Sequence, residues 1–323
     1  MIKVLMNDRG VALILVILMI STIIAITLQL NTASRSGIYE AANLGDGIRA
    51  ACVAKSGFCM GEAILSEDKN DLDSLNEDWA EAELLSSGSG ALFDSEHFRL
   101  HIEDESGRIP INKLVDGPTY NDTIKDLLIR FLNLPEFDLD EQQIRDIVDA
   151  VKDWIDEDDE TTGFGAEDMY YKGLEDPYAC KNAPLDCIEE LLMVKGIAEN
   201  LYYGTDETPG IAEYFTLYGK GAININTAPN LILKVLSDEI TDEMVFDMDE
   251  FRRNEENNLS EAAWYKNIPG MTNITIDPGL ITTQSNIFRI TSTGYLNDIS
   301  RRVSGVIERN GGGTVKRLSW KVD

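Results

Sequence analysis

The residues with the clearest capacity for chemistry form an acidic segment, residues 136–160. This segment contains 12 Asp and Glu residues against only Arg145 and Lys152, a local net charge of −10. Asp153 and the five acids at 156–160 gather where a helical pattern ends, and the helix dipole is already negative at that end. A hard cation would relieve the repulsion, and calcium takes about six to eight oxygen ligands from flexible loops.

A glycine-containing turn at residues 161–165 follows this segment. The turn can bring Glu167 and Asp168 back towards Asp156 and Asp158, which predicts a cation site assembled from both sides of the loop. The site is not an EF-hand, because the Asp-x-Asp pattern lacks the loop glycine and the terminal glutamate at the required spacing. The alternative is an acidic loop that is merely solvated.

Motifs for catalysis are absent from the sequence, and the composition disfavours nucleic acid as a partner. There is no Gly-x-Ser-x-Gly elbow, Walker A loop or Gly-x-Gly-x-x-Gly fingerprint, so we predict no enzymatic activity. The chain has 28 basic and 57 acidic residues, a net charge of −29, whereas phosphate binding requires a surplus of Lys and Arg. Two turns, residues 194–197 and 268–271, resemble those of helix-hairpin-helix motifs, and in this acidic context we interpret them as structural.

Two further pairs of residues are poor candidates for chemistry. His97 and His101 lie on the polar face of an expected strand, in which apolar and polar residues alternate over residues 97–103, so a zinc pair is not predicted. Cys52 and Cys59 lie on one face of an expected helix, about 10.5 Å apart along its axis, which exceeds disulfide reach. We expect these two cysteines to be small packed side chains.

The N-terminus contains an apolar segment long enough to span a bilayer. Residues 11–30 carry no charge, and 20 residues of helix extend for about 30 Å. Lys3 and Arg9 precede the segment and Arg35 follows it, which favours a cytoplasmic N-terminus with the bulk of the chain outside the cytoplasm. A cleavable secretory signal is the alternative, with residues 32–34 as a small-residue cleavage site.

The remaining periodicities predict an α+β unit interrupted by a helical insert. A helix is expected over residues 38–65, a loop at 86–90, and extended segments at 97–103 and 109–114. Helical patterns dominate residues 121–218, where Asp140 and Gln143 have the spacing of a capping box. Further helices are expected at 188–193, 229–237 and 242–253, and a terminal hairpin at 286–308 with its turn near 294–298.

Several motifs carry a family resemblance. Arg9-Gly10 directly before an apolar helix that starts at Val11 resembles the leader of type IV prepilins, which a prepilin peptidase cuts after the glycine. The fifth mature position is Leu15, where most members of that class have Glu. The other blocks, which occur in the same order as in the family, are Asp153-Trp154-Ile155-Asp156, Gly165-Ala166-Glu167-Asp168, Asn182-Ala183-Pro184-Leu185, Leu191-Leu192-Met193-Val194-Lys195-Gly196-Ile197 and Ile225-Asn226-Thr227-Ala228-Pro229. Together they resemble the minor pseudopilin K family of type II secretion systems.

The resemblance implies the fold, the location and the role of the chain. The expected fold is α+β: a pilin-like long N-terminal helix packed on a small antiparallel sheet, with a large inserted α-helical domain. The expected divisions are a prepilin leader (1–10), a transmembrane and assembly helix (11–34), the first part of the pilin-like domain (35–120), the inserted α-domain (121–218) and the second part of the pilin-like domain (219–323). The role implied is a structural subunit that caps or initiates the pseudopilus tip with other minor pseudopilins, anchored in the bacterial inner membrane with its C-terminal domain in the periplasm.

The resemblance also implies a site and its processing. Calcium is expected in the α-domain, with Asp156, Asp158, Glu167 and Asp168 as ligands, and cleavage between Gly10 and Val11 is expected to be followed by methylation of Val11. Outside the cytoplasm, Cys180 and Cys187 are expected to form a disulfide beside the acidic site, the alternative being two free thiols. Two alternative functions remain: a minor pilin-like protein of a type IV pilus, or a membrane-anchored exported calcium-binding protein.

Overall fold

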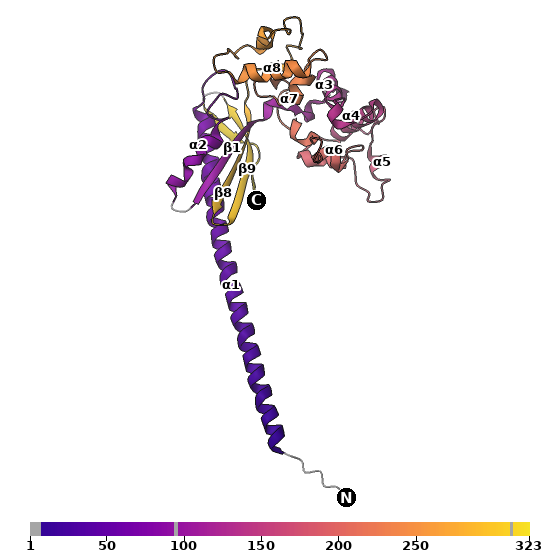
Figure 1. The fold of residues 1–323 in the computed structure, drawn as a ribbon. Coiled ribbons are helices and arrows are strands. Elements are labelled where there is room, and N and C mark those ends of the chain that lie inside the picture. Colours follow the sequence, from indigo (N-terminus) through magenta and orange to yellow (C-terminus); the bar gives the residue numbers. More distant parts are fainter. Residues whose placement is uncertain (1–7, 94–95, 311–312) are drawn as a thin grey trace.

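One long helix, α1 (Asp8–Glu67), extends away from the rest of the molecule (Figure 1). The computed structural model describes residues 8–93, 96–310 and 313–323. Residues 11–45 of α1 are exposed, and only the part that follows packs against other elements. The helix expected over residues 38–65 is therefore present, and it is continuous with the apolar N-terminal segment.

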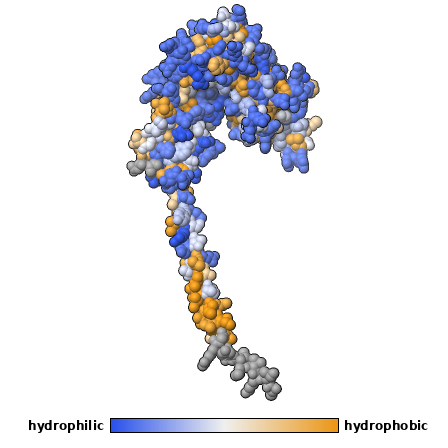
Figure 2. All heavy atoms as spheres, viewed as in Figure 1, coloured by the Kyte–Doolittle hydropathy of each residue, from blue (hydrophilic) through white to orange (hydrophobic). Residues whose placement is uncertain are grey.

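Residues 11–30 of the exposed half of α1 have the mainly apolar surface expected of a helix in lipid, whereas the part nearer the sheet is more hydrophilic (Figure 2). Ser21, Thr22 and Thr27 interrupt the apolar part and Thr32 follows it, but each hydroxyl donates to a backbone carbonyl three or four residues earlier, at 2.8–2.9 Å. These polar groups are thus satisfied within the helix. Within the described residues, α1 is long and apolar enough to cross a membrane.

The packed half of α1 lies on an antiparallel sheet. The strands have the order β1-β8-β9-β10, and β11 also pairs with β9. Their bounds are Glu96–Asp104 (β1), Ile287–Leu296 (β8), Ile299–Asn310 (β9), Thr314–Arg317 (β10) and Lys321–Val322 (β11). The hairpin predicted at 286–308 is confirmed, but β8 continues through Gly294, and the turn lies at residues 297–298.

Two glycines allow the helix to approach the sheet closely. A Cβ at Gly57 of α1 would lie 2.3 Å from Ser292 Oγ, and one at Gly294 of β8 would lie 2.2 Å from the Ala50 carbonyl oxygen. Phe98, Leu100 and Ile102 of β1 alternate towards α1 and are buried with Phe58 and Leu65 of that helix, among others. The long helix is therefore fixed to the sheet by backbone proximity as well as by apolar burial.

Short helical elements cover the outer edge of β1: α2 (Ala82–Ser86) and the 3-10 helix η1 (Ser87–Leu92) (Figure 1). The Ser89 hydroxyl accepts from Phe98 N at 3.1 Å and donates to Phe98 O at 2.9 Å, and Ser86 Oγ accepts from Leu100 N at 3.0 Å. These serines satisfy backbone groups that an edge strand would leave unpaired. The expectation of a loop at 86–90 was wrong. Small polar residues often form turns, but here they lie in α2 and η1 and bind the edge of β1.

Most of the remaining chain forms a second, mainly helical region with one apolar core. Its helices are α3 (Asp122–Leu132), η4 (Pro135–Phe137), α4 (Glu141–Ile155), α5 (Asp168–Tyr171), η5 (Ile188–Met193), α6 (Glu199–Tyr203), η6 (Ile211–Tyr214), α7 (Asn230–Val235), α8 (Asp242–Arg253) and η7 (Ala262–Asn267). The core extends from Ile109 to Ile281, so many residues after 218 pack together with the helices that precede them. The helix expected at 188–193 is a 3-10 helix.

Short strand pairs and two short 3-10 helices complete this region. Parallel pairs join β2 (Ile109–Pro110) to β5 (Phe215–Thr216) and β6 (Ile223–Asn224) to β7 (Ile281–Thr282). An antiparallel pair joins β3 (Val115–Asp116) to β4 (Thr119–Tyr120), and the 3-10 helices η2 (Glu105–Gly107) and η3 (Ile111–Lys113) flank β2. The extended segment expected at 109–114 is therefore limited to its first two residues.

Candidate metal centre

Helix α4 presents the acidic loop, and local sequence explains where the helix starts and ends. The Asp140 side chain accepts from the amides of Gln142 and Gln143, and the Gln143 side chain accepts from Asp140 N, so the predicted capping box is present. At the other end, Asp156 adopts an extended backbone conformation and terminates the helix. The acids at 156–160 therefore begin at the C-terminal end of α4, where the dipole disfavours negative charge.

Two aspartates on the last turns of α4 hold the glycine-containing turn in place. Asp153 accepts from Thr162 N at 3.0 Å, and Asp149 accepts from Phe164 N at 3.0 Å. Gly163 has a φ of 50°, and a Cβ at that position would lie 2.3 Å from Asp149 Oδ2. The turn thus requires glycine, and it brings the chain back across the end of α4.

The structure brings three of the four predicted metal ligands together. Asp156, Asp158 and Glu167 each offer a carboxylate oxygen, and these oxygens lie within 4.8 Å of one another. Asp156 and Glu167 are buried, with exposures of 1% and 3%. Asp168 lies apart from this group: one of its oxygens accepts from Cys180 N at 3.1 Å, and the other pairs with Lys172.

Buried oxygens without partners concentrate at this acidic cluster. Among the described residues, neither Glu167 carboxylate oxygen has a hydrogen-bond partner, and the same is true of Asp156 Oδ1 and Asn182 Oδ1. Asn182 adjoins the cluster, because its side-chain amide donates to the Asp158 carbonyl at 2.7 Å and to Asp159 Oδ1 at 2.8 Å. Four oxygen acceptors left unsatisfied at one place fit a hard cation.

Asn182 is not among the ligands predicted from the sequence. Its local signal is weak: it is a non-glycine residue with a φ of 48°, a conformation that asparagine tolerates better than most residues. Only the fold brings the loop that contains Asn182 against the acidic segment.

The electrostatics of the acidic cluster favour a bound cation. Burial, followed by the charges of Asp153 and Asp156, raises the pKa of Glu167 to about 7. Burial also raises the pKa values of Asp153 and Asp156, although the Lys152 ammonium pairs with Asp156. The cluster therefore retains negative charge that its own side chains do not neutralise, and it can hold a metal ion.

Both cysteines expected to form a disulfide are free thiols in the structure. Cys180 Sγ contacts the Asp153 carbonyl at 3.5 Å, and Cys187 Sγ contacts Glu190 Oε1 at 3.8 Å, so the two side chains have different neighbours. Burial, with a contribution from the Glu167 charge, raises the pKa of the Cys180 thiol to about 12. The structure does not contain the predicted bond, and the pairing stays a prediction for the oxidised protein.

The other cysteines and the histidines are far from this centre. Cys52 and Cys59 are exposed on α1, so the expectation that they pack in a core was wrong. His97 and His101 lie on the exposed face of β1, as predicted, and His97 stacks on Tyr295.

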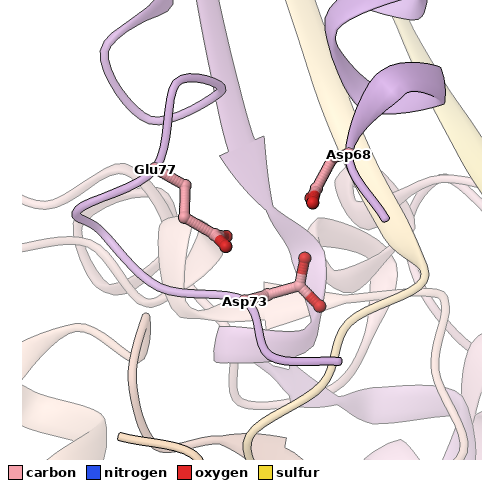
Figure 3. A group of neighbouring side chains, drawn as sticks. All are labelled: Asp68, Asp73 and Glu77. Atoms are coloured by element: carbon pink, nitrogen blue, oxygen red, sulfur yellow. The ribbon is translucent and has the colours of Figure 1, made fainter. Parts of the chain in front are cut away.

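A second group of carboxylates lies just after α1 and was missed by the sequence analysis. Asp68, Asp73 and Glu77 point towards a common space (Figure 3) and also offer oxygens within 4.8 Å of one another. Here the fold supplies its own cation: Arg309 of β9 pairs with Asp68 and contacts Asp73 Oδ1 at 2.5 Å. Glu77 accepts from Ser74 N at 3.1 Å and Trp79 Nε1 at 2.7 Å, so all three carboxylates have protein partners.

The long helix on a small antiparallel sheet places the chain in the class of pilin-like α+β proteins. A chain in the crystal structure of the GspK–GspI–GspJ complex from the enterotoxigenic Escherichia coli type 2 secretion system has a similar fold, with a TM-score of 0.64 and 18% identity over 90% of this chain and 99% of that chain. The sequence model of the family described as type II secretion system (T2SS), protein K, matches residues 107–204, which include the whole acidic cluster.

Curated relatives agree with this match. The type II secretion system protein K of Aeromonas hydrophila is 27% identical over 210 residues, and that of Pseudomonas aeruginosa is 30% identical over 200 residues. The matched segment spans 61% of the length of the Aeromonas relative and 58% of the Pseudomonas relative. Over these segments the chain is similar to members of the type II secretion system protein K family.

Proposed function

We propose that the chain is a minor pseudopilin of a type II protein secretion system, located at the tip of the pseudopilus. The observation that carries this proposal is α1, whose exposed half, apolar over residues 11–30, extends beyond the sheet while its other half is packed on it. A helix exposed in this way needs either lipid or other helices around it. An assembly subunit meets both needs in turn, first in the membrane and then in a filament of equivalent helices.

The N-terminal sequence supports processing of the pilin type. Cleavage by a prepilin peptidase after Gly10 would leave Val11, with its amine methylated, as the first residue of an exposed apolar helix. Most of the predicted leader, residues 1–7, lies outside the described residues, so the proposal rests on the Arg9-Gly10 junction and the helix behind it. Leu15 replaces the usual glutamate, and a helix without that carboxylate would cost less to keep in the bilayer.

The location follows from the same helix and its flanking charges. We place α1 across the bacterial inner membrane as a single span, with the C-terminal part of the chain in the periplasm. The inserted α-domain was predicted at 121–218. Residues from 219 to 281 share the core of that helical region and are absent from the core between α1 and the sheet, which favours a C-terminal bound of the insert near residue 281.

The proposed mechanism is structural rather than catalytic. The helical region is bulky and lies beyond the sheet end of α1 (Figure 1), where it would obstruct the addition of another subunit above. A subunit obstructed in this way would end a filament or initiate one. The related crystal structure contains GspI and GspJ with GspK, and we propose the corresponding minor pseudopilins as the partners of this chain.

We propose calcium as the ion of the acidic cluster. Asp156, Asp158 and Glu167 would supply carboxylate oxygens and Asn182 an amide oxygen, an all-oxygen donor set of the kind that calcium prefers. Asp168, also predicted as a ligand, would need to exchange its contacts with Cys180 N and Lys172 in order to join them. Bound calcium would supply positive charge that fixes the acidic loop against the end of α4.

The intact mass of the full chain, expressed with and without a prepilin peptidase, tests the main proposal. We expect loss of residues 1–10 and a mass increase corresponding to one methyl group, followed by co-purification with the other minor pseudopilins of the same system. An unprocessed chain would argue against pilin-type assembly. Cleavage after the apolar segment would instead indicate an exported calcium-binding protein without an anchor.

A further inference from the structure

Lys152 is a buried cation in direct contact with the candidate metal centre. It lies near the end of α4 and is 5% exposed. Its ammonium group pairs with Asp156 Oδ2 and donates to Thr162 Oγ1 at 2.8 Å. The other oxygen of the same carboxylate, Asp156 Oδ1, is buried and has no hydrogen-bond partner among the described residues.

This contact gives the two oxygens of Asp156 different roles. Oδ2 is committed to the protein's own ammonium group, whereas Oδ1 remains available to a second cation. A buried ion pair that served only the fold would be expected to have both carboxylate oxygens satisfied, because unpaired buried acceptors are costly. Oδ1 and the two unpartnered oxygens of Glu167 therefore point to an ion bound beside Lys152.

The charges in direct contact match a divalent ion. Asp156, Asp158 and Glu167 contribute three negative charges, and Lys152 returns one positive charge, which leaves two negative charges for the ion. A further buried carboxylate, Asp153, accepts from the Thr162 amide at 3.0 and 3.2 Å and is not counted as a ligand, although its negative charge also acts on Glu167. Without the ammonium group, the same three carboxylates would match a trivalent ion better.

We propose that Lys152 sets the charge selectivity of this centre, holding Asp156 in place as a ligand and favouring a divalent over a trivalent cation. The inference rests on the proposed metal site. Since Coulomb energy scales with the product of the charges, Lys152 repels a trivalent ion one and a half times as strongly as a divalent ion at the same position. Loss of the ammonium group must therefore increase the affinity for a trivalent ion more than the affinity for a divalent ion.

The test compares the dissociation constants of Ca²⁺ and Tb³⁺ for the full chain in non-ionic detergent. Ca²⁺ is titrated by calorimetry, and Tb³⁺ by its luminescence under tryptophan excitation. Lys152→Met removes the charge, and Lys152→Arg keeps it. Arg145→Met is the matched control, because Arg145 also lies on α4 and pairs with a carboxylate four residues away, but its side chain is 51% exposed and screened by solvent.

We expect Lys152→Met to increase the preference for Tb³⁺ over Ca²⁺ by at least about tenfold. Lys152→Arg and Arg145→Met should keep the wild-type ratio of the two dissociation constants. If Lys152→Met weakens the binding of Ca²⁺ and Tb³⁺ equally, or changes neither dissociation constant, the selectivity role is refuted. If Glu167→Gln leaves wild-type binding of both ions intact, the metal site itself is refuted, which is a different outcome from failure of the inference.

Discussion

Replacing Glu167 by Gln should stabilise the metal-free protein and abolish its response to calcium. Glu167 is 3% exposed and has no hydrogen-bond partner among the described residues, while Asp156 and Asp158 lie close by. Gln has nearly the same shape but no charge, so the variant removes repulsion without creating a cavity. If Glu167 destabilises the metal-free fold and also binds the ion, its replacement should stabilise the metal-free protein and remove the stabilisation that calcium provides.

The size of the effect follows from the geometry of the acidic cluster. Two unit negative charges 4.8 Å apart repel by about 3.5 kcal/mol at an effective dielectric constant of about 20. Lys152 offsets the charge of Asp156, and solvent screens the half-buried Asp158, so we expect a net gain of about 2 kcal/mol. For a chain of this size, the melting temperature in chelator at pH 8 should rise by about 4 °C.

The effect should depend on pH in a defined direction. The pKa of Glu167 is about 7 in the folded protein, above its ordinary value of 4.5. The folded state therefore binds the proton more tightly than the unfolded state, and wild-type stability falls as the pH rises from 4.5 to 7. The advantage of Glu167→Gln should be full at pH 8 and should disappear as the pH approaches 4.5.

The assay is thermal unfolding of the full chain in chelator and in excess calcium, at several pH values. Calcium at about 100 times its dissociation constant would stabilise the wild type by about 2.7 kcal/mol, which would reverse the order of the two proteins. Glu157→Gln, an exposed acid in the same loop, is the control and should show neither effect. A metal-free Glu167→Gln variant less stable than the wild type at pH 8 would refute the expected repulsion, and an undiminished calcium response would refute the proposed metal site.

Three further predictions concern the rest of the fold. Arg309→Met leaves the buried Asp73 and the partly buried Asp68 without their cation and should cost about 3–5 kcal/mol in a denaturant titration. An unchanged midpoint would show that this ion-pair network adds no stability. Gly57→Ala places a Cβ 2.3 Å from the Ser292 hydroxyl and should lower the free energy of unfolding by about 1–3 kcal/mol. Gly45→Ala, which has open space around the new Cβ, is the control and should not lower stability. Equal effects of the two variants would contradict the close approach of α1 to the sheet. In protein isolated from the periplasm, Cys180 and Cys187 should resist alkylation until a reductant is added, as measured by mass, and immediate labelling of both would exclude the disulfide.

The sequence alone was sufficient for the features that depend on short-range patterns. The uncharged segment at 11–30 predicted an exposed apolar helix, and the alternation at 97–103 predicted a strand with both histidines on its polar face. The capping residues of α4 fixed where the acidic segment begins, since a cap depends on residues only three apart. The density of acids at 136–160 marked the place of the candidate metal centre.

Tertiary structure decided which of those acids act together. Asp156, Asp158 and Glu167 converge because Asp149 and Asp153 hold a turn across the end of α4, and Asn182 arrives from another loop. Asp168, adjacent to Glu167 in sequence, faces Lys172 and the Cys180 amide instead. Neighbouring side chains diverge in direction, and spacing alone does not say which one faces the cluster.

The second group of carboxylates is the feature that the sequence predicted least. Asp68 and Arg309 are separated by 241 residues, and no local pattern links the end of a helix to the last part of a strand so distant in sequence. Ser86 and Ser89 likewise gain their roles only because β1 lies beside them with its backbone groups unpaired. Periodicity reports the local conformation and the buried face of each element, whereas the partner of a buried charge or of a strand edge is determined only when distant segments pack together.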